Sequence, residues 1–84
     1  MKFRKKPIVI EAVQLGDSKE DIAVALRFCG PLQMFSPGPV RFAVRTLEGQ
    51  MEGNVGDWLI KGVAGEFYFC KPDIFEQTYE PAGQ

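Results

Sequence analysis

The chain has 84 residues, of which 45% are hydrophobic and 25% are charged, and these proportions exclude a disordered chain and fit a folded globular protein. Ten lysines and arginines against eleven acidic residues give a net charge of −1, so total charge offers no argument for nucleic acid as a partner. There is room for one small domain over residues 1–84. Because so short a chain leaves much of its surface exposed, we expect a homo-oligomer.

The first residues, MKFRKKPIVIEAVQL, imitate a secretory signal, in which a basic stretch precedes an apolar one. Glu11 interrupts the apolar run, and no segment reaches the roughly 18 apolar residues that a membrane span needs. We therefore expect a cytosolic protein without a membrane partner. In the cytosol Cys29 and Cys70 stay reduced, and Cys29 is expected to pack as a small apolar side chain.

Four of the ten cationic side chains lie within the first six residues, as Lys2, Arg4, Lys5 and Lys6. Two interpretations are open for this cluster. It contacts phosphate or an acidic partner, or it is a solvated end of the chain.

A strand and a helix are predicted first along the chain. Residues 8–15 (IVIEAVQL) form a β-branched apolar run between Pro7 and Gly16, which is typical of a mostly buried strand. Residues 17–29 then predict a helix with capping and acidic residues in its first turn, followed by Gly30 and Pro31 at its end. Its apolar stripe consists of Ile22, Ala25, Leu26 and Cys29.

The segment 32–40, LQMFSPGPV, is rich in proline and glycine and predicts a surface loop or an irregular edge. Its Met34 and Phe35 either tuck under the core or offer a contact surface to another chain. The sequence leaves both alternatives open.

A β-meander is predicted next, with strands over residues 40–47, 50–53, 58–61 and 66–70 separated by glycine-containing turns. The first of them alternates most clearly, because Arg41 and Arg45 face one side and Val40, Phe42 and Val44 the other.

The chain is predicted to end in a single helical turn over residues 72–76, with Pro72 at its first position, and an extended piece over 77–80. The order of elements predicts an α+β fold, with one main helix packed on a strongly bent antiparallel sheet or partial barrel of about five strands.

The sequence contains no histidine, which removes the commonest general base and metal ligand near neutral pH. Two cysteines 41 positions apart are a poor zinc set, and the phosphate-loop pattern G-x-x-x-x-G-K-(S/T) does not occur. The carboxylates follow no specific pairing pattern. We therefore predict that the protein is not an enzyme and uses no metal or cofactor.

The residue inventory favours binding. Arginine and lysine can neutralise an anion, and flat aromatic rings can stack on a base. The predicted site for a small anionic ligand, such as a cyclic nucleotide, consists of Arg41, Arg45, Trp58, Lys61, Tyr68 and Lys71. Each has a structural alternative, since strand arginines are often solvated and tryptophan is often core. Asp57 and Asp73 fit turn and helix-start chemistry.

Two segments carry a family resemblance: KFRKKPIVIEAVQ at the start and GDWLIKGVAGEFYFCKPDIFEQTYEP at the end. They resemble small uncharacterised proteins of tailed bacteriophages and prophages, which begin K-F-R-K-K-P before E-A-x-Q. Those proteins end G-D-(W/Y)-(I/L)-I-K-G, G-E-x-Y and C-K-P-D-I-F before T-Y. The segments cover somewhat under half of the chain. Family members often carry an aromatic residue where this chain has Leu15 and a proline where it has Phe69.

The resemblance implies a phage-encoded accessory protein that acts in the host bacterial cytoplasm. We expect it to counter host defence by sequestering a nucleotide-type signalling molecule. An inhibitor or adaptor that binds a host protein through Met34 and Phe35 or a sheet edge is the main alternative. A minor structural phage protein that uses the basic N-terminus is a third.

Overall fold

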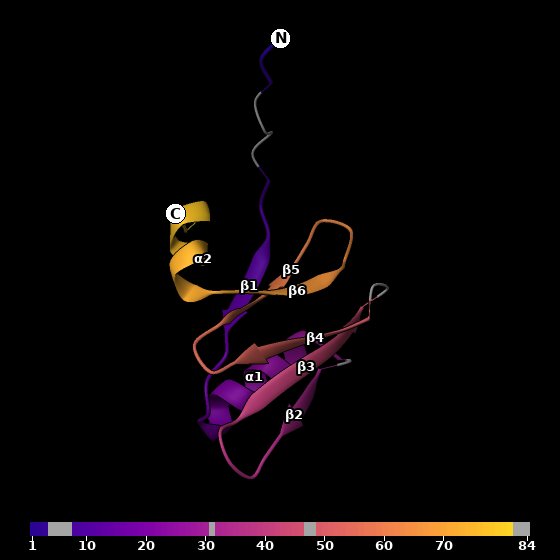
Figure 1. Ribbon diagram of the computed structural model, residues 1–84, viewed down its shortest axis with the longest axis vertical. Coiled ribbons are helices and arrows are strands. Elements are labelled where there is room, and N and C mark those ends of the chain that lie inside the picture. Colours follow the sequence, from indigo (N-terminus) through magenta and orange to yellow (C-terminus); the bar gives the residue numbers. More distant parts are fainter. Residues whose placement is uncertain (4–7, 31, 47–48, 82–84) are drawn as a thin grey trace.

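The chain forms two small antiparallel sheets and two helices in the computed structural model (Figure 1), which describes residues 1–3, 8–30, 32–46 and 49–81. Sheet A has the strand order β1-β5-β6, and sheet B has the order β2-β3-β4. The elements are β1 Glu11–Gln14, α1 Lys19–Phe28, β2 Gln33–Phe35, β3 Arg41–Thr46, β4 Gly49–Asn54, β5 Trp58–Lys61, β6 Phe67–Cys70 and α2 Pro72–Thr78. The predicted features at Arg4, Lys5, Lys6, Pro31 and Leu47 lie outside the described residues.

The predicted α+β class is confirmed, but the prediction of one bent sheet or partial barrel of about five strands is wrong. The described residues form six strands in two sheets, and neither sheet closes. The predicted meander breaks between β4 and β5, because β5 pairs with β1 rather than with β4. Two backbone hydrogen bonds of Leu15 hold the end of β1 beside the start of β5. The Leu15 N–H donates to the Asp57 carbonyl at 2.8 Å, and the Leu15 carbonyl accepts from the Gly56 N–H at 2.8 Å.

Three predicted elements differ in extent. The loop predicted over residues 32–40 contains the short strand β2, which pairs with β3 and forms an edge of sheet B, so the irregular-edge alternative describes it better. Helix α2 runs on to Thr78, so the predictions of a single turn over 72–76 and an extended piece over 77–80 are wrong. Strand β1 is shorter than the predicted strand over residues 8–15.

The core lies between the two sheets and helix α1. The Ser18 side chain accepts the Asp21 N–H at 3.0 Å and thereby caps the start of this helix. Cys29 is fully buried, as predicted, whereas Leu26 is exposed and lies off the buried stripe. The buried cluster consists of Leu15, Ala25, Cys29, Leu32, Phe42, Val44 and Leu59.

The two sheets approach each other closely where β4 has a glycine. A Cβ atom added to Gly53 would lie 2.6 Å from a ring carbon of Phe69, a distance that real Cβ atoms do not adopt. The absent side chain is therefore what allows the Phe69 ring to pack against β4.

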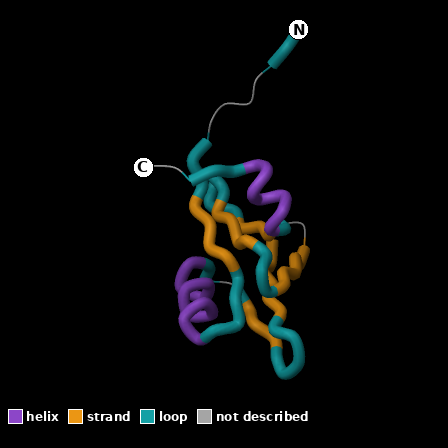
Figure 2. The backbone as a smooth tube through the Cα atoms, turned by 90° about the vertical axis from the view of Figure 1, so that its left-hand side faces the viewer, coloured by secondary structure: helices purple, strands orange, loops and turns teal. Residues whose placement is uncertain are grey.

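The two helices lie on opposite sides of the strands (Figure 2). Helix α1 covers the core side of sheet A, where Phe28 meets Phe67 edge to face at 5.9 Å between ring centroids. Helix α2 covers the other side of sheet A, and this second contact frames the candidate site.

Candidate functional site

Strand pairing determines which side chains of sheet A face away from the core. Ala12, Ile60 and Tyr68 are register partners across the three strands. Since side chains two positions apart share a face, Trp58 lies on the same side as Ile60. This outer face is therefore apolar and aromatic, in contrast to the polar outer faces that are common on small antiparallel sheets.

Helix α2 covers part of this face with aromatic residues spaced four apart. The ring of Phe75 stacks on the indole of Trp58, with 4.1 Å between centroids and 6° between planes. Tyr79 follows one turn later, 5.0 Å from Phe75 between centroids, and its hydroxyl lies 3.4 Å from that of Tyr68. The contacts of Phe75 with Trp58 and of Tyr79 with Tyr68 hold the helix against β5 and β6.

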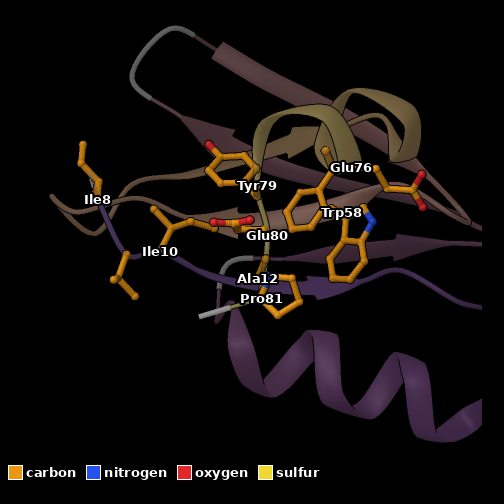
Figure 3. Close-up of a pocket in the computed structure, with 10 residues that line it drawn as sticks. Ile8, Ile10, Ala12, Trp58, Glu76, Tyr79, Glu80 and Pro81 are labelled. Atoms are coloured by element: carbon orange, nitrogen blue, oxygen red, sulfur yellow. The ribbon is translucent and has the colours of Figure 1, made fainter. Parts of the chain in front are cut away.

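A groove of about 610 Å³ remains beside these rings, between α2 and the segment that leads into β1 (Figure 3). One wall is formed by aliphatic side chains of the N-terminal segment and the other by α2 and the residues after it. The groove is lined by Ile8, Val9, Ile10, Ala12, Trp58, Phe75, Glu76, Tyr79, Glu80 and Pro81.

The charged groups of the groove are acidic. Among the described residues, the ten that line it include Glu76 and Glu80 and no lysine or arginine. In Figure 3 the Glu80 carboxylate points toward the side of Ile10, and Glu76 lies at the opposite end, past Trp58. An apolar floor with carboxylates at its rim suits a hydrophobic group that carries positive charge.

Two side chains near the groove, Tyr68 and Cys70, have pKa values above those of free tyrosine and cysteine. The hydrogen bond to Tyr79 and burial raise the pKa of Tyr68 to about 12. Burial, together with the negative charges of Asp57 and Asp73, raises the pKa of the Cys70 thiol. Both groups therefore hold their protons near neutral pH, and neither acts there as an anion.

The six residues predicted for an anion site do not gather at the groove. Only Trp58 lines it, and Tyr68 lies on the same face behind Tyr79. Lys61 is exposed on the opposite face of sheet A, at the register position beside Glu11. Lys71 lies at the start of α2, with its Nζ 3.6 Å from Oδ2 of Asp57.

The two arginines lie on the other sheet. Arg41 and Arg45 flank Ala43 on the outer face of sheet B. Arg41 reaches Glu52 at 3.8 Å and lies over the ring of Phe35 at 5.8 Å. The two arginines, together with the carboxylate of Glu52 opposite Ala43, form a charged surface that is separate from the groove.

The buried turn aspartate fits its predicted structural role. Asp57 is 6% exposed, and its carboxylate accepts the N–H of Asn54 at 3.0 Å, as turn aspartates commonly do. Asp73 lies in the first turn of α2, also as predicted.

Sequence reasoning missed most of the groove. It predicts a buried strand for the aliphatic wall, and it places Glu76, Tyr79 and Glu80 at the end of a helical turn and in an extended piece. The signal that was present is the i, i+4 spacing of Phe75 and Tyr79, which predicts an aromatic helix face once the helix extends past residue 76.

Among the described residues, no cluster of three or more cysteine, aspartate or glutamate side chains has the arrangement of a metal site. No helix in the described part of the chain has the length and apolar character of a membrane span.

No protein-family model matches the chain, and neither the curated proteins nor the solved structures give a match. The resemblance to small phage proteins therefore stays a prediction from the two terminal motifs.

Proposed function

We propose that the chain is a non-enzymatic binding protein whose groove holds an apolar segment of a host protein with lysine or arginine beside it. The observation that carries this proposal is the lining of the groove, in which eight apolar or aromatic residues surround a space of about 610 Å³ with two carboxylates. Pockets that recognise ligands combine such apolar walls with a few placed polar groups.

Charge decides between a cationic and an anionic occupant. Glu76 and Glu80 would repel the phosphates of a nucleotide and attract lysine or arginine of a peptide. Trp58, Phe75 and Tyr79 add flat rings against which an aliphatic or cationic side chain can pack. The groove therefore favours the protein-binding alternative over nucleotide sequestration at the same place.

Peptide binding in the groove can be followed by the fluorescence of Trp58, because Trp58 is the sole tryptophan of the chain and lines the groove. A short peptide that alternates leucine and lysine is titrated while the emission of Trp58 is recorded. We expect a saturable change for this peptide and none for the matched peptide in which glutamate replaces lysine.

A matched surface variant controls for nonspecific attraction. Glu52→Gln removes an exposed carboxylate on sheet B, away from the groove, and should leave the titration unchanged. Equal responses to the basic and acidic peptides, or no response to either, would refute the proposed occupant.

A second candidate function rests on the arginine surface of sheet B. Arg41 and Arg45 flank the small side chain of Ala43, and Phe35 lies beside Arg41, so phosphates and a base could each find a partner there. This arrangement favours sequestration of a nucleotide signal on that face. Calorimetry with cyclic and linear nucleotides tests it, with heat expected for the natural chain and none for Arg41→Ala/Arg45→Ala.

Both candidate functions assume that the protein acts in the cytoplasm of a host bacterium, and the resemblance to phage proteins supports this location. A phage-encoded protein in the cytoplasm of its host meets host enzymes and defence signals, and binding suffices to block either. We therefore propose that the partner is a host bacterial protein, and that the effect on it is inhibition or recruitment.

A further inference from the structure

Strand β1 is an outer strand of sheet A, and among the described residues no strand pairs with its other side. It pairs with β5 alone, with Val13 opposite Leu59 and Ala12 opposite Ile60. Leu15 forms hydrogen bonds on the β5 side, so by antiparallel alternation Val13 and Glu11 do the same. Ala12 and Gln14 therefore turn their backbone N–H and C=O groups outward.

The three residues before β1 are not part of a strand, and they continue the chain past the end of β5. Ile8, Val9 and Ile10 precede Glu11 and lie beyond Lys61, the last residue of β5. Their side chains are apolar, and Val9 is 76% exposed. Over residues 8–14 the edge carries one charged side chain, that of Glu11.

Edge strands normally carry features that prevent association, such as charge, short length or twist. The edges of sheet B follow this rule: β2 has three residues, and β4 places Gln50 and Glu52 among glycines. The edge over residues 8–14 lacks these protective features, because it is longer than β2 and mostly apolar. Such an edge is suited to pair with another strand.

We propose that a second copy of the chain pairs its own residues 8–12 with this edge, antiparallel and about a two-fold axis at Ile10. The two copies of sheet A then form one continuous six-stranded sheet. Ile10 faces Ile10 of the second copy, Ile8 faces Ala12, and Val9 faces Glu11.

Charge and hydrogen bonding favour this register over an axis at the neighbouring residue, Glu11. A two-fold axis at Glu11 would place two carboxylates directly opposite each other, which is destabilising. In the proposed dimer residues 8–10 continue the alternation of β1, so Ile8, Ile10 and Ala12 bond through their N–H and C=O groups to the second copy. It also covers the exposed aliphatic side chains of both chains.

The second copy would also complete the groove. Ala12 lines the groove, and the proposed pairing sets Ile8 of the second copy beside it. This consequence rests on the proposed function, whereas the dimer itself does not, because it follows from the edge alone.

Light scattering coupled to gel filtration tests the dimer. We expect the natural chain to have the mass of two copies, and Ile10→Lys to weaken self-association at least tenfold by placing two ammonium groups together at the axis. Val63→Lys is the matched control, since Val63 is an apolar residue 72% exposed in the turn after β5. It should stay dimeric.

Disulfide trapping tests the register in a Cys70→Ser background. The Ile10→Cys variant should cross-link to itself under mild oxidation, because facing residues in this pairing lie at a distance that suits a disulfide. The Glu11→Cys variant should not, since position 11 faces Val9 of the second copy. A monomeric natural chain, a dimeric Ile10→Lys, or cross-linking of the Glu11→Cys variant in place of the Ile10→Cys variant would each overturn the proposal.

The two proposals fail separately. A monomeric natural chain whose Trp58 emission still responds to the basic peptide overturns the edge pairing and leaves the proposed function supported. A dimer that ignores every peptide refutes the proposed function and leaves the pairing intact.

Discussion

The indole of Trp58 and the ring of Phe75 lie parallel, with 4.1 Å between their centroids and 6° between their planes. This stack joins β5 to α2, elements that are separated by a turn and a strand. It fixes the helix against the outer face of sheet A and, with it, one wall of the groove.

Removal of this stack should loosen α2. Phe75→Ala is expected to lower the free energy of unfolding by roughly 1–3 kcal/mol, less than for a fully buried phenylalanine, because Phe75 is half-buried. The emission of Trp58 should shift to the red as water reaches the indole. Ile74→Ala, at a neighbouring position 53% exposed, is the control and should leave both quantities nearly unchanged.

The close approach of the two sheets depends on Gly53. Gly53→Ala places a methyl group against the Phe69 ring, and we expect a loss of about 1–3 kcal/mol in urea unfolding, as for other overpacked cores. Gly30→Ala is the matched control, because an added Cβ there meets nothing within 4 Å. Equal stability of the two variants would contradict the close packing of Phe69 on β4.

The turn before β5 depends on a buried carboxylate. Asp57→Ala leaves the Asn54 N–H without its acceptor and should cost about 1–3 kcal/mol. Lys71→Ala removes the other partner of Asp57, an exposed ammonium group, and should cost less than about 1 kcal/mol. A larger loss for the lysine variant in thermal unfolding would show that the ion pair, and not the turn, dominates.

Tyrosine ionisation should reveal the contact between Tyr68 and Tyr79. The pKa of Tyr68 is raised from 10.0 to about 12, first by that hydrogen bond, so the folded state holds this proton more tightly than the unfolded state. Its contribution to stability is thus fully present below about pH 10 and is lost as the pH rises through about 12.

Tyr79→Phe leaves Tyr68 as the sole tyrosine of the chain, so its tyrosinate absorbance can be followed alone. The titration midpoint of Tyr68 is expected to fall toward 10.0, because the largest cause of the raised pKa has been removed. A midpoint that stays near 12 would show that burial, rather than the hydroxyl contact, raises it.

Local patterns in the sequence predicted the elements that depend on neighbours along the chain. The capping residues at the start of the helix, Asp17 or Ser18, and the alternation around Phe42 correctly indicated α1 and β3, and the structure has Ser18 as the cap. The partner of β5 could not be found in this way, because its pairing with β1 joins residues more than forty positions apart and depends on the hydrogen bonds of Leu15.

The groove could not be predicted from the sequence, for the same reason. Its lining comes from residues 8–10 and Ala12, from Trp58, and from five residues of α2 and the segment after it. These segments are far apart in the sequence and meet only in the folded chain. The arginines were recognised as a possible anion surface, but their separation from Trp58 follows from the division into two sheets, which the predicted single meander concealed.

Reversal of charge at both ends of the groove tests the central claim most directly. In Glu76→Lys/Glu80→Lys the affinity for the leucine–lysine peptide should collapse, and the leucine–glutamate peptide should bind instead, with the emission of Trp58 as the readout. If the reversed groove keeps its preference for the basic peptide, or if neither peptide discriminates between the two forms, the groove does not select its partner by charge and the account is wrong.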